Sequence, residues 1–96
     1  MGIGLVVRLK VHPGKGPEFE AAFARQAAGV RANEKGNKLY QLVRSREDKD
    51  VYVVMELYDG EADLAVHRDA PHMVENRGVI GPLVAERLGF EIFDAC

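Results

Sequence analysis

The fold class of this chain is decided by the stretch Ile3-Gly4-Leu5-Val6-Val7-Arg8-Leu9-Lys10-Val11. An apolar side chain stands at every second position of this stretch, at Ile3, Leu5, Val7, Leu9 and Val11. Successive side chains of a strand point to opposite faces, so this period predicts a β-strand with one buried face. We expect residues 3–11 to form a strand that lies against the core of the protein.

A helix is predicted after the glycine-rich loop that follows this strand. Pro17 suits the first helical position, because its φ is already helical and its missing N–H would have no partner there. Apolar residues then recur at spacings of three and four, at Phe19, Ala22, Phe23, Ala27 and Val30. We expect the helix to run to near Glu34, with Gly36 in the left-handed conformation that commonly follows a helix.

The remainder of the chain predicts a hairpin, two short helices and a last strand. Residues 38–45 and 51–58 are rich in Val, Leu and Tyr and flank a charged turn, which is typical of an antiparallel hairpin. Asp59 can cap a helix through about Arg68, and Pro71 restarts a short helix toward Arg77. A strand over about 88–93 completes a β-α-β-β-α-β order, which favours an α+β, ferredoxin-like antiparallel sheet with helices on one face.

The size of the chain and the second face of its sheet favour a homodimer. A single domain of 96 residues buries only about 60 to 65 % of its unfolded surface, so a partner would enlarge its core. Both faces of the strand at 51–58 are largely apolar, which indicates cover on both sides. Two copies packed sheet against sheet would supply that cover and form a dimeric α+β barrel.

The composition excludes several classes of protein. A net charge of −2, without basic runs interleaved with aromatic residues, gives no reason to expect nucleic acid as a partner. The one cysteine, Cys96, allows neither an internal disulfide nor a cysteine-based metal site. No apolar stretch approaches the roughly 20 residues that span a bilayer, and no leader sequence is recognisable at the start. We expect no membrane partner and a cytoplasmic location.

Candidate functional residues gather between positions 52 and 73. Glu56 lies among apolar neighbours in a buried strand, so it should have a partner, for which His67, His72, Arg44 and Arg8 are candidates. A buried ion pair that only fixes helix to sheet is the alternative to a catalytic role.

The same segment does not favour a metal site. The two histidines are five residues apart with a proline between them, unlike the i, i+4 pair of a helical zinc site, so we expect no metal. Tyr40, Tyr52 and Tyr58 offer rings and hydroxyls to a phenol-like ligand, although tyrosines on strands are more often core or interface residues.

Three segments carry a family resemblance that covers nearly the whole chain. Residues 36–45, GNKLYQLVRS, resemble the second-strand segment of the antibiotic biosynthesis monooxygenase family, and residues 52–58, YVVMELY, resemble its third strand. The most specific piece is 65–72, AVHRDAPH, which is similar to the family signature A-x-H-x-x-(small)-P-H. Two departures are Tyr58 where the family usually has Trp, and Met73 where it often has an aromatic residue.

The resemblance implies a cofactor-independent monooxygenase, an oxidoreductase that uses no flavin, haem or metal. In such an enzyme an electron-rich quinol, phenol or anthrone is deprotonated, and its anion reduces dioxygen. The resemblance implies His67 or His72 as general base, with Glu56 as the group that orients it. Tyr58 and Met73 would be pocket walls, and Arg44 or Tyr40 would contact the anion.

Two other functions stay open at this stage. The first is an isomerase acting on a small phosphorylated or ketonic metabolite, which would need a cationic site built from Arg44, Arg68 or Arg77. The second is a non-catalytic dimeric module that binds a hydrophobic metabolite or serves only as structure. A cavity between helices and sheet, reached by His67, His72 or Glu56, distinguishes an enzyme from a closed structural module.

Overall fold

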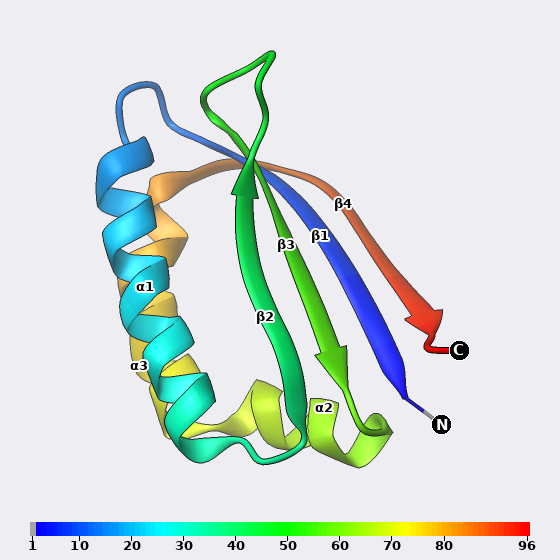
Figure 1. Ribbon diagram of the computed structural model, residues 1–96. Coiled ribbons are helices and arrows are strands. Elements are labelled where there is room, and N and C mark those ends of the chain that lie inside the picture. The colour runs from blue at the N-terminus through cyan, green and yellow to red at the C-terminus, as the bar shows by residue number, and fades with distance from the viewer. Residues whose placement is uncertain (1) are drawn as a thin grey trace.

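The computed structural model describes residues 2–96 and contains one antiparallel sheet with helices on one face (Figure 1). In chain order its elements are β1 (Ile3–Val11), α1 (Gly16–Asn33), β2 (Asn37–Arg44), β3 (Val51–Tyr58), α2 (Glu61–Asp69), α3 (Pro71–Ile80), the 3₁₀ turn η1 (Gly81–Leu83) and β4 (Val84–Asp94). The strands lie in the order β2-β3-β1-β4. The predicted ferredoxin-like α+β fold is therefore confirmed.

The strand β1 lies inside the sheet and pairs on both of its edges. On one side Leu5 lies opposite Glu56 of β3, and on the other it lies opposite Ile92 of β4. Paired residues share a face of the sheet, so the buried face of β1 continues onto β3 through Tyr52, Val54, Glu56 and Tyr58. The alternation within residues 3–11 thus predicted the face on which the core is built.

Aromatic rings join the helix α1 to this face. The ring of Phe19 lies 4.9 Å from that of Tyr52, and the ring of Phe23 stacks on Tyr40 at 5.0 Å. The Tyr52 hydroxyl donates to Glu20 at 2.6 Å, and burial together with this hydrogen bond raises the pKa of Tyr52 to about 12. The apolar stripe of the helix and the tyrosines of the hairpin therefore form one core.

The helices make a single layer over the sheet. Figure 1 shows α1 and α3 side by side, with α2 beyond the end of β3. Pro71 separates α2 from α3, as the sequence predicts, because the residue before a proline is disfavoured in helical conformation. None of the helices within residues 2–96 is long and apolar enough to cross a membrane.

The backbone conformation at the end of α1 differs from the expected one. Glu34, with φ of −112° and ψ of 94°, is the extended residue that ends the helix. Among residues 2–96 the one glycine with positive φ is Gly14, so the expectation of a left-handed Gly36 was wrong. Gly36 is needed for a different reason, since a Cβ there would collide with the carboxyl group of Asp63.

Two other boundaries differ from the expected ones. The residue before α2 is Gly60 and no side chain caps that helix, so the expected cap by Asp59 was wrong. The Asp59 carboxylate instead lies 3.5 Å from Lys38 Nζ on β2. The last strand begins at Val84 and not near Leu88, because β4 pairs with β1 as far as Val11 through backbone hydrogen bonds that need no apolar alternation.

A helical glycine gives the first prediction. No atom lies within 4 Å of a Cβ built on Gly78 in α3, so Gly78→Ala should raise the free energy of unfolding by ~0.5 to 1 kcal/mol through helix propensity. Gly29 in α1 is the matched contrast, because its Cβ would lie 2.9 Å from the Cβ of His72. Gly29→Ala should therefore destabilise. Urea titrations measure both changes, and equal effects of the two substitutions would contradict this packing.

Candidate functional site

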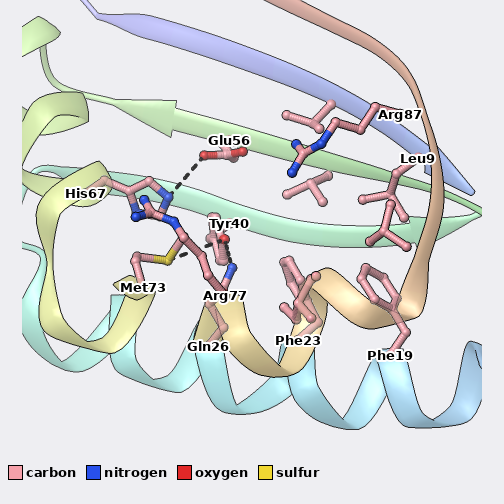
Figure 2. Close-up of a pocket in the computed structure, with 15 residues that line it drawn as sticks. Leu9, Phe19, Phe23, Gln26, Tyr40, Glu56, His67, Met73, Arg77 and Arg87 are labelled. Atoms are coloured by element: carbon pink, nitrogen blue, oxygen red, sulfur yellow. Dashed lines mark hydrogen bonds and ion pairs between the residues drawn. The ribbon is translucent and has the colours of Figure 1, made fainter. Parts of the chain in front are cut away.

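A cavity of about 310 Å³ lies between the helix layer and the sheet (Figure 2). Its wall is mostly apolar and is formed by Val7, Leu9, Phe19, Phe23, Val54, Met73, Ile80, Gly81 and Val84. Six polar side chains complete the lining, namely Gln26, Tyr40, Glu56, His67, Arg77 and Arg87. An apolar cavity with a few convergent polar groups is the usual form of a small-molecule site.

His67 projects from α2 into one end of this cavity. Its Nδ1 lies 2.9 Å and 3.1 Å from the two carboxylate oxygens of Glu34, and its Nε2 lies 3.7 Å from Oε1 of Glu56. The residue is only 5 % exposed. Burial lowers the pKa of His67 below its ordinary value, against the raising effect of Glu34, so the imidazole is neutral at neutral pH.

Glu56 is the buried carboxylate that the sequence singled out. The hydroxyl of Tyr58, two residues later on the same face of β3, donates to Glu56 Oε1 at 2.7 Å. Burial raises the pKa of Glu56, and the nearby charge of Glu34 adds to this shift, while the hydrogen bond from Tyr58 opposes it. The cavity therefore holds a carboxyl group that is more basic than usual beside a histidine that is less basic than usual.

Tyr40 lines the cavity with its hydroxyl between Gln26 and Met73. Gln26 Nε2 donates to the Tyr40 oxygen at 2.5 Å, and Asn76 Nδ2 donates to Gln26 Oε1 at 3.1 Å. The Tyr40 hydroxyl faces the sulfur of Met73 at 4.0 Å, which is a weak acceptor (Figure 2). Burial raises the pKa of Tyr40, so its proton stays in place and can be donated to a ligand oxygen.

Two arginines enter the cavity from different elements. Figure 2 shows Arg77 extending from α3 and Arg87 extending from β4. Neither guanidinium has a carboxylate within 4 Å in the part of the chain that the structure describes, although Arg77 donates to the backbone oxygen of Arg68 at 2.5 Å. Both cations are therefore open to a negatively charged group in the cavity.

The expected site residues divide into two groups. His67, Glu56, Tyr40 and Met73 line the cavity together. Three others are absent from its lining, namely His72, Tyr58 and Arg44. His72 lines a separate pocket together with Glu34 and Val66, and Tyr58 donates a hydrogen bond to Glu56. Arg44 is exposed on β2, 3.7 Å from Glu20.

Three polar groups of the site were missing from the sequence-based set. Gln26 occupies the buried face of α1 between Phe23 and Ala27, and a polar residue in an apolar stripe was a signal that could have been used. Glu34 was interpreted only as the end of the helix, and Arg87 stands in a segment without clear alternation. Gln26 and Glu34 act through partners that are 14 and 33 residues away in the chain, beyond the reach of a local pattern.

The described residues contain no group of three or more His, Cys, Asp or Glu side chains arranged to hold a metal ion. What the cavity offers is acid–base and hydrogen-bonding chemistry. A neutral imidazole can accept a proton, a tyrosine can donate a hydrogen bond, and two guanidinium groups can stabilise an anion.

The raised pKa of Glu56 predicts a pH-dependent effect of Glu56→Gln. A carboxyl group whose folded pKa lies above its unfolded value contributes stability that is present at low pH and lost as pH rises through the folded pKa. Glutamine keeps an acceptor for Tyr58 without the buried charge. The variant should therefore exceed the wild type in free energy of unfolding at pH 8, and the difference should shrink toward pH 4.

Urea titrations at pH 4, 6 and 8 measure this difference. Tyr58→Phe is the contrast, because it removes the donor that supports the charged form, and it should lower stability more at pH 8 than at pH 4. A larger gain for Glu56→Gln at pH 4 than at pH 8 would contradict the assignment of a buried, poorly solvated carboxylate.

Comparison with known proteins agrees with this fold. The family model described as antibiotic biosynthesis monooxygenase matches residues 2–76. A structure from Caulobacter crescentus, assigned by name to these monooxygenases, is 40 % identical, with a TM-score of 0.94 over 99 % of this chain and 90 % of the other.

A more distant structure carries a named activity. It is a point variant of SnoaB from Streptomyces nogalater, which is described as a cofactor-independent oxygenase. It is 26 % identical to this chain, with a TM-score of 0.84 over 98 % of this chain and 92 % of its own. No curated protein sequence matches the chain. The match over residues 2–76 and the 40 % identity over almost the whole length show that the chain belongs to the antibiotic biosynthesis monooxygenase family.

Proposed function

We propose that this protein is a cofactor-independent monooxygenase that oxidises a quinol, phenol or anthrone with dioxygen. The observation that carries the proposal is the free Nε2 of a neutral, buried His67 at one end of an apolar cavity of aromatic-ring size. The family assignment and the named activity of SnoaB support the reaction class. Of the two histidines expected as candidates for the general base, we propose His67, because His72 is not among the residues that line the cavity.

The reaction begins with a proton transfer. His67 Nε2 takes the proton of the substrate, and the resulting anion passes one electron to dioxygen. The superoxide and the substrate radical then combine to form a C–O bond, which leaves a peroxide on the carbon. As the O–O bond breaks, the C–H proton passes to the departing oxygen, which leaves a carbonyl group and hydroxide. The proton held by His67 then converts the hydroxide into water.

The remaining polar groups hold the substrate and its negative charge. Tyr40, kept in its protonated form by burial, donates to the anionic oxygen, with Gln26 fixing the orientation of its hydroxyl. Arg77 and Arg87 add positive charge to the lining of the cavity. The apolar wall excludes water from the anion, which strengthens each of these interactions.

An isomerase acting on a small anionic metabolite is the second candidate, and one specific observation favours it. Of the three arginines expected for its cationic site, Arg77 lines the cavity. A second arginine that was not among the three, Arg87, lines it as well. Oxygen consumption distinguishes the two reactions, because an isomerase uses none. A purely structural role is the least supported interpretation, since the histidine and Glu56 border an open cavity and are not closed against each other.

We also propose that the protein is a homodimer. The sheet face turned away from the helices carries Val53, Met55 and Leu57 of β3, which are half-buried, and Leu39, Val43 and Phe93, which are 43 %, 38 % and 46 % exposed. A second copy would cover this face with an equally apolar surface, as two-fold packing of identical faces requires. Its burial would enlarge the core of a short chain, which buries a smaller share of its surface than a longer domain does.

Oxygen uptake with a reduced naphthoquinol or an anthrone tests the proposed activity. The wild type should exceed spontaneous autoxidation, and His67→Gln should lower kcat by about 10²-fold or more, because the general base is lost. His12→Gln in the exposed loop after β1 is the matched control and should retain full activity. A rate equal to autoxidation with both substrates would reject the proposal for these classes.

Analytical ultracentrifugation tests the dimer. The wild type should sediment at about twice its chain mass of 10.6 kDa. Met55→Glu places a charge in the middle of the uncovered face and should shift the protein to monomer. Val74→Glu introduces the same charge at a side chain that is 54 % exposed on α3 and should leave the dimer intact. Dimers of unchanged affinity in Met55→Glu would show that this face is not the interface.

A further inference from the structure

A buried carboxylate outside the cavity binds both histidines of the signature segment. Glu34, at the end of α1, has a side chain that is only 3 % exposed. It lies 2.9 Å from Nδ1 of His67 through one oxygen, and its other oxygen lies 2.5 Å from Nε2 of His72. No step of the proposed reaction uses Glu34 or His72 directly. This bridge therefore needs an explanation of its own.

The bridge decides where the proton of His67 is. A carboxylate has only acceptor sites, so a ring nitrogen at hydrogen-bond distance from it must carry a hydrogen. Nδ1 of His67 is such a nitrogen, and Nε2 then has a free lone pair because the neutral ring carries one N–H. That lone pair lies at the cavity wall, 3.7 Å from Oε1 of Glu56. A histidine in the opposite tautomer would present an N–H there and could not accept a proton.

Within residues 2–96 no other carboxylate lies close enough to fix this tautomer. Glu56 is 3.7 Å from Nε2 of His67, which is too long for a hydrogen bond, and its Oε1 already accepts from Tyr58. The groups that face His67 from the surrounding elements are Glu34 of α1, Tyr40 of β2, Glu56 and Tyr58 of β3, and His72 and Arg77 of α3. Of these, Glu34 alone lies within hydrogen-bond distance of the His67 ring nitrogens.

A glycine in α1 makes the second arm of the bridge possible. A Cβ on Gly29 would lie 2.9 Å from Cβ and 3.0 Å from Cγ of His72, so α3 can approach α1 this closely only where α1 has no side chain. A glycine inside a helix costs about 1 kcal/mol relative to alanine. The close approach that it permits places His72 on the outer oxygen of Glu34 and holds that carboxylate in place.

We propose that Glu34 is the positioning residue of the site: held by His72, it fixes His67 in the Nδ1–H tautomer, so that Nε2 is free to accept the substrate proton. The catalytic part of this inference rests on the function proposed above. The tautomer itself is a property of the resting protein and can be measured without a substrate. The same arrangement of a carboxylate behind a histidine orients the general base in hydrolases of unrelated fold.

Nitrogen-15 NMR of the ¹⁵N-histidine-labelled protein measures the tautomer directly at pH 8. The wild type should show a protonated Nδ1 and an unprotonated Nε2 for His67, because the two nitrogens then differ strongly in chemical shift. Glu34→Gln removes the charge and one acceptor and offers an N–H to the ring, so the Nδ1–H form should no longer dominate. A dominant Nε2–H tautomer in the wild type would overturn the proposal.

Two substitutions at His72 separate positioning from simple stabilisation. His72→Gln keeps an N–H that can donate to Glu34 and should preserve the His67 tautomer. His72→Leu removes the donor and should weaken it. If both variants destabilise the fold equally and leave the tautomer unchanged, His72 only stabilises the packing of α3, and its proposed support of the Glu34 carboxylate is wrong.

The pH profile is the matching kinetic readout. In the wild type kcat/KM should fall as the pH drops through the lowered pKa of His67, because the base must be neutral. Glu34 raises that pKa, so Glu34→Gln should move the fall to lower pH and reduce kcat by about 10-fold or more. An unchanged pH profile with an unchanged kcat would overturn the positioning role.

The NMR result is independent of the reaction. If the tautomer responds to Glu34 as expected while no oxygen is consumed, the positioning of His67 stands and the oxygenase function fails. If oxygen uptake depends on His67 but the tautomer does not depend on Glu34, the function stands and the positioning role fails.

Discussion

The pairing of β1 on both of its edges is the constraint on which the rest of this structure depends. It aligns the buried face of β1 with that of β3, and the polar exception on that face is Glu56. The helices must cover this face, because its apolar side chains and tyrosine rings would otherwise lie in water. The covering layer brings α2 and α3 against the end of α1, where Glu34 meets the two histidines.

The site combines two kinds of buried polar group, and each has its partner. Glu56 accepts from Tyr58, and Glu34 binds His67 and His72, so the described chain has no buried side-chain nitrogen or oxygen without a hydrogen-bond partner. Satisfied networks of this kind make a cavity wall rigid, whereas a single unpaired charge would cost several kcal/mol. Among the described residues no group lies within hydrogen-bond distance of Nε2 of His67, and this residue lines the cavity.

Relatedness to the antibiotic biosynthesis monooxygenases extends over the whole fold, whereas the chemistry depends on particular side chains. Similarity of fold alone does not determine a reaction, and relatives below 25 % identity bear only on the architecture. The two arginines in the cavity and the carboxylate behind His67 are features of this chain's own residues. The two guanidinium groups place positive charge in the lining of an otherwise mostly apolar cavity.

The sequence by itself determined the element order, the buried face of the sheet and the histidine segment. These are local properties, since alternation over 3–11, the stripe from Phe19 to Val30 and the break at Pro71 each depend on neighbours within a few residues. The same local patterns predicted His67 and Glu56 near one site, because the strand that carries Glu56 runs directly into the helices that carry the histidines.

Only the tertiary structure decided which groups meet. Glu34 is 33 residues from His67 in the chain, and no local pattern distinguishes it from an ordinary helix end. His72 and Arg44 fit the expected chemistry by residue type, yet neither lines the cavity. The closeness of α3 to α1 places His72 on Glu34, and Arg44, the last residue of β2, is exposed beside Glu20. Periodicity predicts which face of an element is buried, but packing between elements determines the partners of each side chain on it.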